Sequence, residues 1–145
     1  MIGKVIDINI SEKKGVVKKP IEKGVFIEDY GLEGDAHAGK WHRQVSLLSY
    51  EKIEEFRARG AEVEFGAFGE NLVISDYDFK IFPIGTKFRC NDVILELTQI
   101  GKECHHGCQI FQKMGDCIMP REGVFCRVLK GGTIKTGDLF TKIEK

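Results

Sequence analysis

The sequence lacks net charge, a secretion signal and any long apolar run. Its 22 Lys and Arg residues are matched by 22 Asp and Glu residues, so no overall positive field would attract nucleic acid. The N-terminal segment MIGKVIDINI alternates apolar and polar residues, whereas a signal peptide needs a continuous apolar stretch. No apolar run approaches the roughly 20 residues that cross a bilayer. We therefore expect a cytoplasmic protein that binds neither nucleic acid nor membranes.

The cysteines are too few, and odd in number, for a disulfide framework. Five cysteines leave at least one unpaired, and without an export signal we expect free thiols. Cys90 and Cys126 lie in apolar, strand-like stretches, so we predict that both are buried core residues. The length of 145 residues fits one domain, 1–145, whose folding buries roughly two-thirds of the unfolded surface.

Short apolar runs between glycines dominate the rest of the chain. The 17 glycines separate stretches rich in β-branched and aromatic residues, a pattern typical of many short strands. We predict a mainly β, compact fold with a few short helices, and a closed or nearly closed barrel would leave few unpaired edges. The expected strands cover residues 4–10, 24–27, 44–48, 71–74, 86–90, 93–99, 124–129 and 139–143.

Two helices and three turns complete the predicted secondary structure. The better helix covers residues 49–59, with Ser49 as N-cap and Gly60 ending it in a left-handed conformation. A second, short helix is expected around residues 110–114. We expect hairpin turns at residues 91–92 and 130–132. The third turn, at residues 13–19, is expected to be a solvated loop.

The segment from Gly101 to Phe111 concentrates reactive side chains. Three residues separate Cys104 from Cys108, among them His105 and His106, and Lys102 lies two positions before Cys104. If a helix begins just before Cys108, its dipole and the nearby cation favour thiolate over thiol. A thiolate binds soft metals and attacks sulfur or carbon, so this segment is the leading candidate for the working group.

Two other interpretations of the cysteines remain open. A structural zinc site could use Cys104, one of the two neighbouring histidines, Cys108 and Cys117. The spacing of the first pair suits zinc, although no second closely spaced pair completes the pattern. Alternatively, these side chains are incidental surface groups without a ligand, although exposed cysteine is normally avoided.

Three further segments carry polar side chains on predicted turns. Asp35, His37, His42 and Arg43 lie in a glycine-rich loop, where a carboxylate, imidazoles and a guanidinium suit an anionic ligand. The glycine-spaced segment 65–72, with Asn71 near its end, permits close approach of a planar ligand. The third segment, 120–123, carries Arg121, which lies near Cys117 in the sequence. Each of the three segments could instead be a simple turn.

Seven short motifs follow one another along the chain. They are Gly-x-x-Gly-Asp-x-His, His-Arg-Gln-Val-Ser, Gly-x-Phe-Gly-Glu-Asn-Leu, Pro-Ile-Gly-Thr, Thr-Gln-Ile-Gly-Lys-x-Cys-His, Gly-Asp-Cys-Ile-Met-Pro-Arg-Glu-Gly-Val-Phe and Lys-x-Gly-Asp. In this order they closely resemble the MOSC family, the domain named for the C-terminal part of molybdenum cofactor sulfurase. The resemblance runs from about residue 4 to residue 140, and the motifs are more specific together than singly.

The resemblance implies a MOSC-type barrel and specific site residues. The family's key cysteine corresponds to Cys108 as the metal ligand, with Cys104 as its competitor because the spacing is one residue longer than in some members. The implied binding site for the molybdenum cofactor, molybdopterin, is completed by side chains that would line the pterin and phosphate pocket. These are Asp35, His37, Arg43, Asn71, His105 and Arg121.

The same resemblance implies a function and its alternatives. The chain resembles the small standalone bacterial form, and we expect neither a pyridoxal-phosphate domain nor an electron-transfer module in its 145 residues. The leading hypothesis is a molybdenum-cofactor-associated binding or sulfur-carrier domain, whose cargo is an anionic pterin or a small thiol or sulfur species. A sulfur donor or a molybdoenzyme would be its protein partner. The alternatives are a molybdenum-dependent reductase of N-hydroxylated compounds, with separate electron donors, and a structural zinc protein.

Overall fold

The protein folds around a closed β-barrel, as seen in a computed structural model that describes residues 2–14, 16–101 and 118–143. Seven strands pair in the order β1-β6-β5-β9-β8-β7-β11, and β11 pairs back to β1 to close the barrel. The mainly β prediction is confirmed. The strands are β1 (Ile2–Ile10), β5 (Val45–Ser49), β6 (Leu72–Ile74), β7 (Lys87–Cys90), β8 (Val93–Ile100), β9 (Val124–Lys130) and β11 (Leu139–Lys142).

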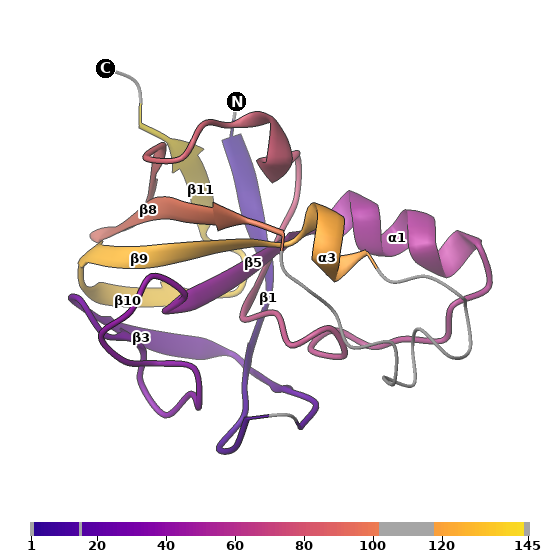
Figure 1. Cartoon of the computed structure of the whole chain (residues 1–145), viewed down its shortest axis with the longest axis horizontal. Helices are drawn as coiled ribbons and strands as arrows, with labels where there is room; N and C mark the ends of the chain where they lie inside the picture. The colour runs from indigo at the N-terminus through magenta and orange to yellow at the C-terminus, as the bar shows by residue number, and fades with distance from the viewer. Residues whose placement is uncertain (1, 15, 102–117, 144–145) are drawn as a thin grey trace.

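Four short strands and the helices surround this barrel. β2 (Lys19–Ile21) extends the sheet beside β1, while β10 (Gly132–Lys135), β3 (Lys23–Ile27) and β4 (Gly31–Leu32) form a separate small sheet. The helices α1 (Tyr50–Ala58) and α3 (Met119–Glu122) lie together beyond one end of the barrel, to the right in Figure 1. A 3-10 turn, η1, covers Phe79–Ile81.

Helix α1 connects the parallel pair of strands. β5 and β6 run parallel, with Leu47 opposite Leu72, and a parallel pair needs a crossover connection, which α1 and the loop after it provide. Ile53 and Phe56 are the buried residues of α1 and pack in a small apolar cluster with Phe125 of β9. The helix therefore covers one end of the barrel with an apolar face.

The barrel interior is built from alternating apolar residues and a group of aromatic rings. Along β8, Val93, Leu95 and Leu97 are buried while the residues between them are partly exposed, as expected for a strand with one face on the core. Phe88 and Phe140 stack with ring centroids 5.2 Å apart. The core thus depends mainly on apolar burial and ring packing.

The predicted elements agree with the structure within two residues for all eight strands. The helix predicted at residues 49–59 is α1, and Gly60 has the left-handed φ of 105° expected after it. The hairpin turn at Asn91 is confirmed, with a φ of 55° at Asn91 and Cys90 paired to Val93. The helix predicted around residues 110–114 lies outside the described residues. No sequence pattern predicted the two- to four-residue strands β2, β4 and β10.

Two predicted turns were wrong. Residues 130–132 do not join a hairpin, because β10 pairs with β3 and not with β9. A Cβ added at Gly131 would lie 2.6 Å from the Phe26 carbonyl oxygen, so the glycine is needed for close approach between segments. Residues 13–19 are not uniformly solvated, because Lys18 is only 2% exposed. Val16 and Val17 are instead 52% and 62% exposed, so the usual apolar-in pattern is inverted there.

The two cysteines predicted to be core residues are buried. Cys90 is 1% exposed and Cys126 is 0% exposed. Burial, assisted by the charge of Asp138, raises the pKa of the Cys90 thiol to about 12, and burial with the charge of Glu96 raises the pKa of Cys126 further. Both thiols therefore stay protonated and unreactive at neutral pH. Within the described ranges, no helix combines the length and apolar character that crossing a bilayer requires.

Candidate functional site

The predicted cysteine segment connects two neighbouring barrel strands. β8 ends at Ile100, and the chain re-enters the described region before α3 and β9. At this position the Gly101 amide donates a hydrogen bond of 2.6 Å to the Gly123 carbonyl, joining the two ends of the connection. Cys104, His105 and Cys108 lie in residues 102–117, outside the described residues. Their roles therefore stay predictions.

The loop that carries His42 and Arg43 is bonded to the same end of β8 and β9. His42 Nε2 lies 2.8 Å from Gln99 Oε1 of β8, and the Thr98 hydroxyl donates to the His42 carbonyl. The Arg43 guanidinium carbon lies 5.5 Å from the ring centroid of Phe125 in β9. This loop is thus held next to the strand ends from which the cysteine segment departs.

Arg43 has the clearest features of a ligand-binding cation. Its guanidinium also packs over Trp41, 5.2 Å from the ring centroid, so it contacts two aromatic rings. Such contacts favour a cation and fix the orientation of its planar head. Its Nε is buried and has no hydrogen-bond partner in the part of the chain that the structure describes. An unpaired buried donor costs free energy, which an anionic ligand would recover.

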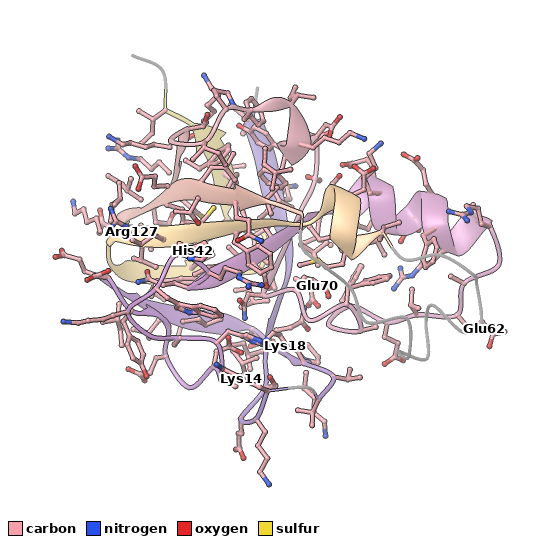
Figure 2. All side chains as sticks on the ribbon, viewed as in Figure 1. Lys14, Lys18, His42, Glu62, Glu70 and Arg127 are labelled. Carbon is pink, nitrogen blue, oxygen red and sulfur yellow. The ribbon has the colours of Figure 1, made fainter. Side chains whose placement is uncertain are left out.

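Asp35 and His37 meet a residue that the sequence did not single out. Lys18 Nζ lies 2.6 Å from Asp35 Oδ1 and 3.1 Å from His37 Nδ1, and the ion-paired side chains are 1% and 0% exposed. Lys18, labelled in Figure 2, is a buried residue. A lysine in a basic, polar stretch normally faces water, so no local sequence signal could have identified it.

Trp41 connects Arg43 to the cluster of Lys18, Asp35 and His37, called the Lys18 group below. Its indole N–H donates to the His37 carbonyl over 2.8 Å, while Arg43 packs on its ring. Lys14 Nζ also lies 5.2 Å from the same ring centroid. The structure therefore brings the predicted residues Asp35, His37 and Arg43 into one positively charged neighbourhood around a single indole.

Asn71, another predicted site residue, is fully buried and bonded to backbone. Its Oδ1 accepts from the Ser46 amide over 2.9 Å, and its Nδ2 donates to the Asn9 carbonyl over 3.0 Å. It thereby ties β5 and β1 to the start of β6. Its contact with a ligand stays a prediction, as does that of Arg121, whose backbone lies in α3 and whose side chain falls outside what the structure describes.

Glu70 is a buried carboxyl beside Asn71. Its two oxygens accept from the amides of Gly66 and Phe68 over 2.8 and 3.1 Å. These bonds shape the tight turn in which Gly66 has a φ of 92°. Burial raises the pKa of Glu70 to about 7, against the opposing effect of the amides. Its carboxyl therefore stabilises the turn that precedes β6 by accepting hydrogen bonds from two of the turn's amides.

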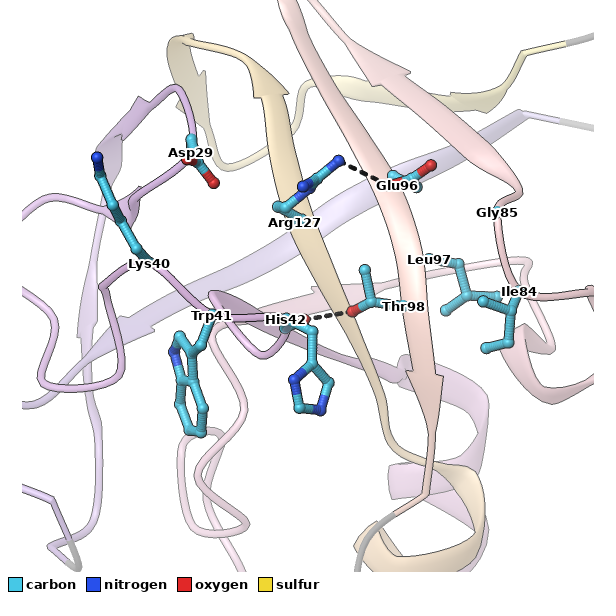
Figure 3. A pocket seen from close by; sticks show the side chains of 10 residues that line it. All are labelled: Asp29, Lys40, Trp41, His42, Ile84, Gly85, Glu96, Leu97, Thr98 and Arg127. Carbon is cyan, nitrogen blue, oxygen red and sulfur yellow. Dashed lines mark hydrogen bonds and ion pairs between the residues drawn. The ribbon is translucent and has the colours of Figure 1, made fainter.

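A cavity of about 530 Å³ lies on the outer face of β8 and β9 (Figure 3). Arg127 and Glu96 form an ion pair of 3.3 Å across its wall, and Trp41 and His42 border it from the loop. Of the side chains predicted in the loop to bind an anion, His42 alone lines it, so the cavity adjoins the predicted site. The lining residues are Asp29, Lys40, Trp41, His42, Ile84, Gly85, Glu96, Leu97, Thr98 and Arg127.

The described residues contain no group of three or more His, Cys, Asp or Glu side chains that could hold a metal ion. The whole ligand set of the structural zinc hypothesis falls in residues 102–117, so that hypothesis stays a prediction.

The fold resembles several solved structures at low sequence identity. YuaD from Bacillus subtilis matches with a TM-score of 0.76 at 19% identity, covering 100% of this chain and 98% of that chain. YiiM from Geobacillus stearothermophilus matches with a TM-score of 0.73 at 19% identity, covering 98% and 75%. At such identity, the likeness establishes the barrel fold and nothing about activity.

Sequence comparison gives the family. The protein YflK of Bacillus subtilis is 26% identical over 165 residues, covering 99% of this chain and 72% of the relative. The model of the MOSC domain matches residues 34–141, which include most of the barrel and the whole cysteine segment. The chain therefore belongs to the MOSC domain family, a family of molybdenum-cofactor-related domains.

Proposed function

We propose that this chain is a molybdenum-cofactor-associated binding or sulfur-carrier domain in which Cys108 acts as a thiolate. The thiolate either ligates molybdenum in a bound pterin cofactor or carries a sulfane sulfur. Soft thiolate ligands suit a sulfur-bearing metal centre. Membership in the MOSC family supports the link to the cofactor, and Cys104 remains the competing thiol.

The observation that carries the proposal is the unpaired Arg43. The cofactor is an anion, and its phosphate needs cationic donors with a fixed orientation. The buried Nε of Arg43 without a described partner, and the two aromatic rings that hold its guanidinium, meet that need. Arg43 also stands next to the strand ends from which the cysteine segment leaves. The described residues thus fit an anionic cofactor.

Each of the predicted residues would have its own role in binding the cofactor. Arg43 would hold the phosphate, His37 would contribute a ring nitrogen, and Asp35 would keep the loop in place through its bonds to Ser11 and His37 amides. Asn71 would hold together the strands behind this loop. When bound, the cofactor would supply the redox or sulfur-exchange chemistry, as cofactors do.

The direct test is metal and mass analysis of protein purified from molybdenum-replete cells. Molybdenum with pterin, or a persulfide mass increment, is expected in the wild type and is expected to be lost in Cys108→Ser. Cys117→Ser is the matched control, because this proposal leaves loading unchanged while the zinc hypothesis requires Cys117. Full loading of Cys108→Ser together with loss of loading in Cys104→Ser would assign the working thiol to Cys104. Stoichiometric zinc that is lost in all three variants would overturn the proposal.

The same preparation tests Arg43. Arg43→Met is expected to weaken cofactor retention by about ten- to hundredfold, since a hydrogen bond to a charged group contributes about 1.5–3 kcal/mol. Arg127→Met is the control, because Arg127 is an exposed arginine paired with Glu96 outside the proposed site. Equal retention by both variants would contradict the role of Arg43.

A further inference from the structure

The Lys18 ammonium is buried and all of its hydrogen bonds are accounted for. An ammonium has three N–H donors and no lone pair. Its three acceptors are Asp35 Oδ1 at 2.6 Å, His37 Nδ1 at 3.1 Å and Ser11 Oγ at 3.3 Å. With 1% of the side chain exposed, these acceptors replace water completely. The geometry therefore assigns one N–H of Lys18 to each acceptor.

Asp35 holds this arrangement from the other side. Its Oδ1 also accepts from the Ser11 amide over 3.0 Å, and its Oδ2 accepts from the His37 amide over 3.2 Å. The carboxylate therefore binds the main chain of His37 and not its ring. A buried ion pair persists when its remaining hydrogen bonds are satisfied in this way. The Lys18 group is thus a rigid polar unit.

The tautomer of His37 follows from the donor that faces it. Because Lys18 Nζ can only donate, Nδ1 of His37 must accept with its lone pair, and the ring proton must reside on Nε2. We propose that Lys18 is a positioning residue that holds His37 as a neutral ring with its proton on Nε2. The Nε2–H of His37 is then a hydrogen-bond donor, and its Nδ1 is unavailable to a metal.

This arrangement reverses what an aspartate beside a histidine usually does. A carboxylate that accepts Nδ1–H leaves a lone pair on Nε2, which suits a base or a metal ligand. Here the lysine stands between the carboxylate and the ring, so Nε2 carries a proton in place of that lone pair. A donor suits the anionic oxygen or sulfur atoms of a molybdenum cofactor. That choice of ligand, unlike the tautomer, rests on the proposed function.

Nuclear magnetic resonance of the histidine ring nitrogens tests the tautomer directly. Long-range proton–nitrogen spectra of ¹⁵N-labelled full-length protein distinguish a nitrogen that carries a proton from one with a lone pair. The His37 signals are assigned among the four histidines by their loss in His37→Gln. Recording the spectra after removal of bound metal and pterin separates this result from the proposed function, which is tested by the metal and mass analysis.

Two variants test whether Lys18 is the cause. Lys18→Met combined with Asp35→Asn removes both charges, so that no unpaired charge stays buried. Lys19→Met is the matched control, because Lys19 is the exposed neighbour. The wild type and Lys19→Met are expected to show a proton on Nε2 alone, and the double variant is expected to show averaged signals from both tautomers.

The wild-type spectrum alone can overturn the tautomer assignment. A proton on Nδ1, or on both nitrogens at pH 7.5, would do so whether or not any variant folds. An unchanged single-tautomer pattern in a folded double variant would show that Lys18 does not determine the tautomer. A shift to averaged signals in Lys19→Met would equally remove the specific role of Lys18.

Discussion

The barrel interior and the polar region beside it are both buried, but the first consists of apolar side chains and the second of charged and amide side chains. The interior is packed with rings and branched side chains, among them Phe88 and Phe140 at 0% exposure. The region around Lys18 buries charged and amide groups from four separate segments. Several of the buried polar groups of this chain therefore gather next to the residues predicted for the site. These groups are Asn9, Lys18, Asp35, Glu70 and Asn71.

The energetic reasons for the two regions differ. Apolar burial stabilises the barrel in proportion to the area removed from water. Buried polar groups gain little net stability even when they are paired, and cost free energy when they are not. The buried Arg43 Nε lacks a partner among the described residues. Polar burial here therefore makes more sense as preorganisation of a site than as a source of stability.

Truncation of an aromatic ring in the barrel core is expected to have the largest effect on the free energy of unfolding. Phe88→Ala should lower the free energy of unfolding by about 3–5 kcal/mol, because it removes a ring from a close-packed core. Phe88 contacts Tyr77, Phe79, Phe82 and Phe140 through ring pairs. Urea denaturation followed by circular dichroism measures the change.

Ile84→Ala is the control for Phe88→Ala. Ile84 is a large apolar residue that is 59% exposed, so its truncation should cost less than about 0.5 kcal/mol. Equal losses in the two variants would show that the aromatic rings do not form the stabilising centre that the structure indicates.

The barrel was predictable from the sequence because its signals are local. Period-two alternation identified β8, and Asn91 with Asp92 identified the hairpin before it, where the structure has a left-handed φ at Asn91. The small sheet was missed because its β3–β10 pairing joins residues about 110 positions apart, which alternation within one segment cannot reveal.

The site was less predictable because burial of polar groups is a tertiary property. Asp35, His37 and Arg43 were found through motifs, and the structure brings them together around Trp41. Lys18 was assigned to a solvated loop, since charge patterning cannot tell which of several lysines turns inward. Its partners lie 17 and 19 residues away, so only the fold identifies it.

The buried carboxyl of Glu70 makes the stability of the protein depend on pH. Burial raises its pKa from 4.5 to about 7, so the native state holds a proton that the unfolded state releases. The stabilising contribution is fully present below pH 4.5 and is lost as pH rises to about 7. Over that window the free energy of unfolding should fall by about 3 kcal/mol from this group.

Glu70→Gln measures this contribution by subtraction. The variant cannot release a proton, so its stability should vary less between pH 4.5 and 7 than that of the wild type, as measured by urea denaturation at each pH. Glu62→Gln makes the same change at an exposed carboxyl and should keep the wild-type pH dependence. If Glu70→Gln also keeps it, the Glu70 carboxyl does not gain a proton on folding.

The smallest effect is expected at an ion pair that combines the same charges as Lys18 and Asp35 but faces water. Arg127 and Glu96 lie 3.3 Å apart, and their side chains are 45% and 26% exposed. Exposed pairs contribute about 0–1 kcal/mol because water screens the attraction and ordering two long side chains costs entropy. Arg127→Met should therefore lower the free energy of unfolding by less than about 1 kcal/mol in urea denaturation, and added salt should shrink the difference further. A loss near that of Phe88→Ala would mean that charge pairs on the barrel surface matter to stability as much as its core, and the contrast between the two regions would no longer hold.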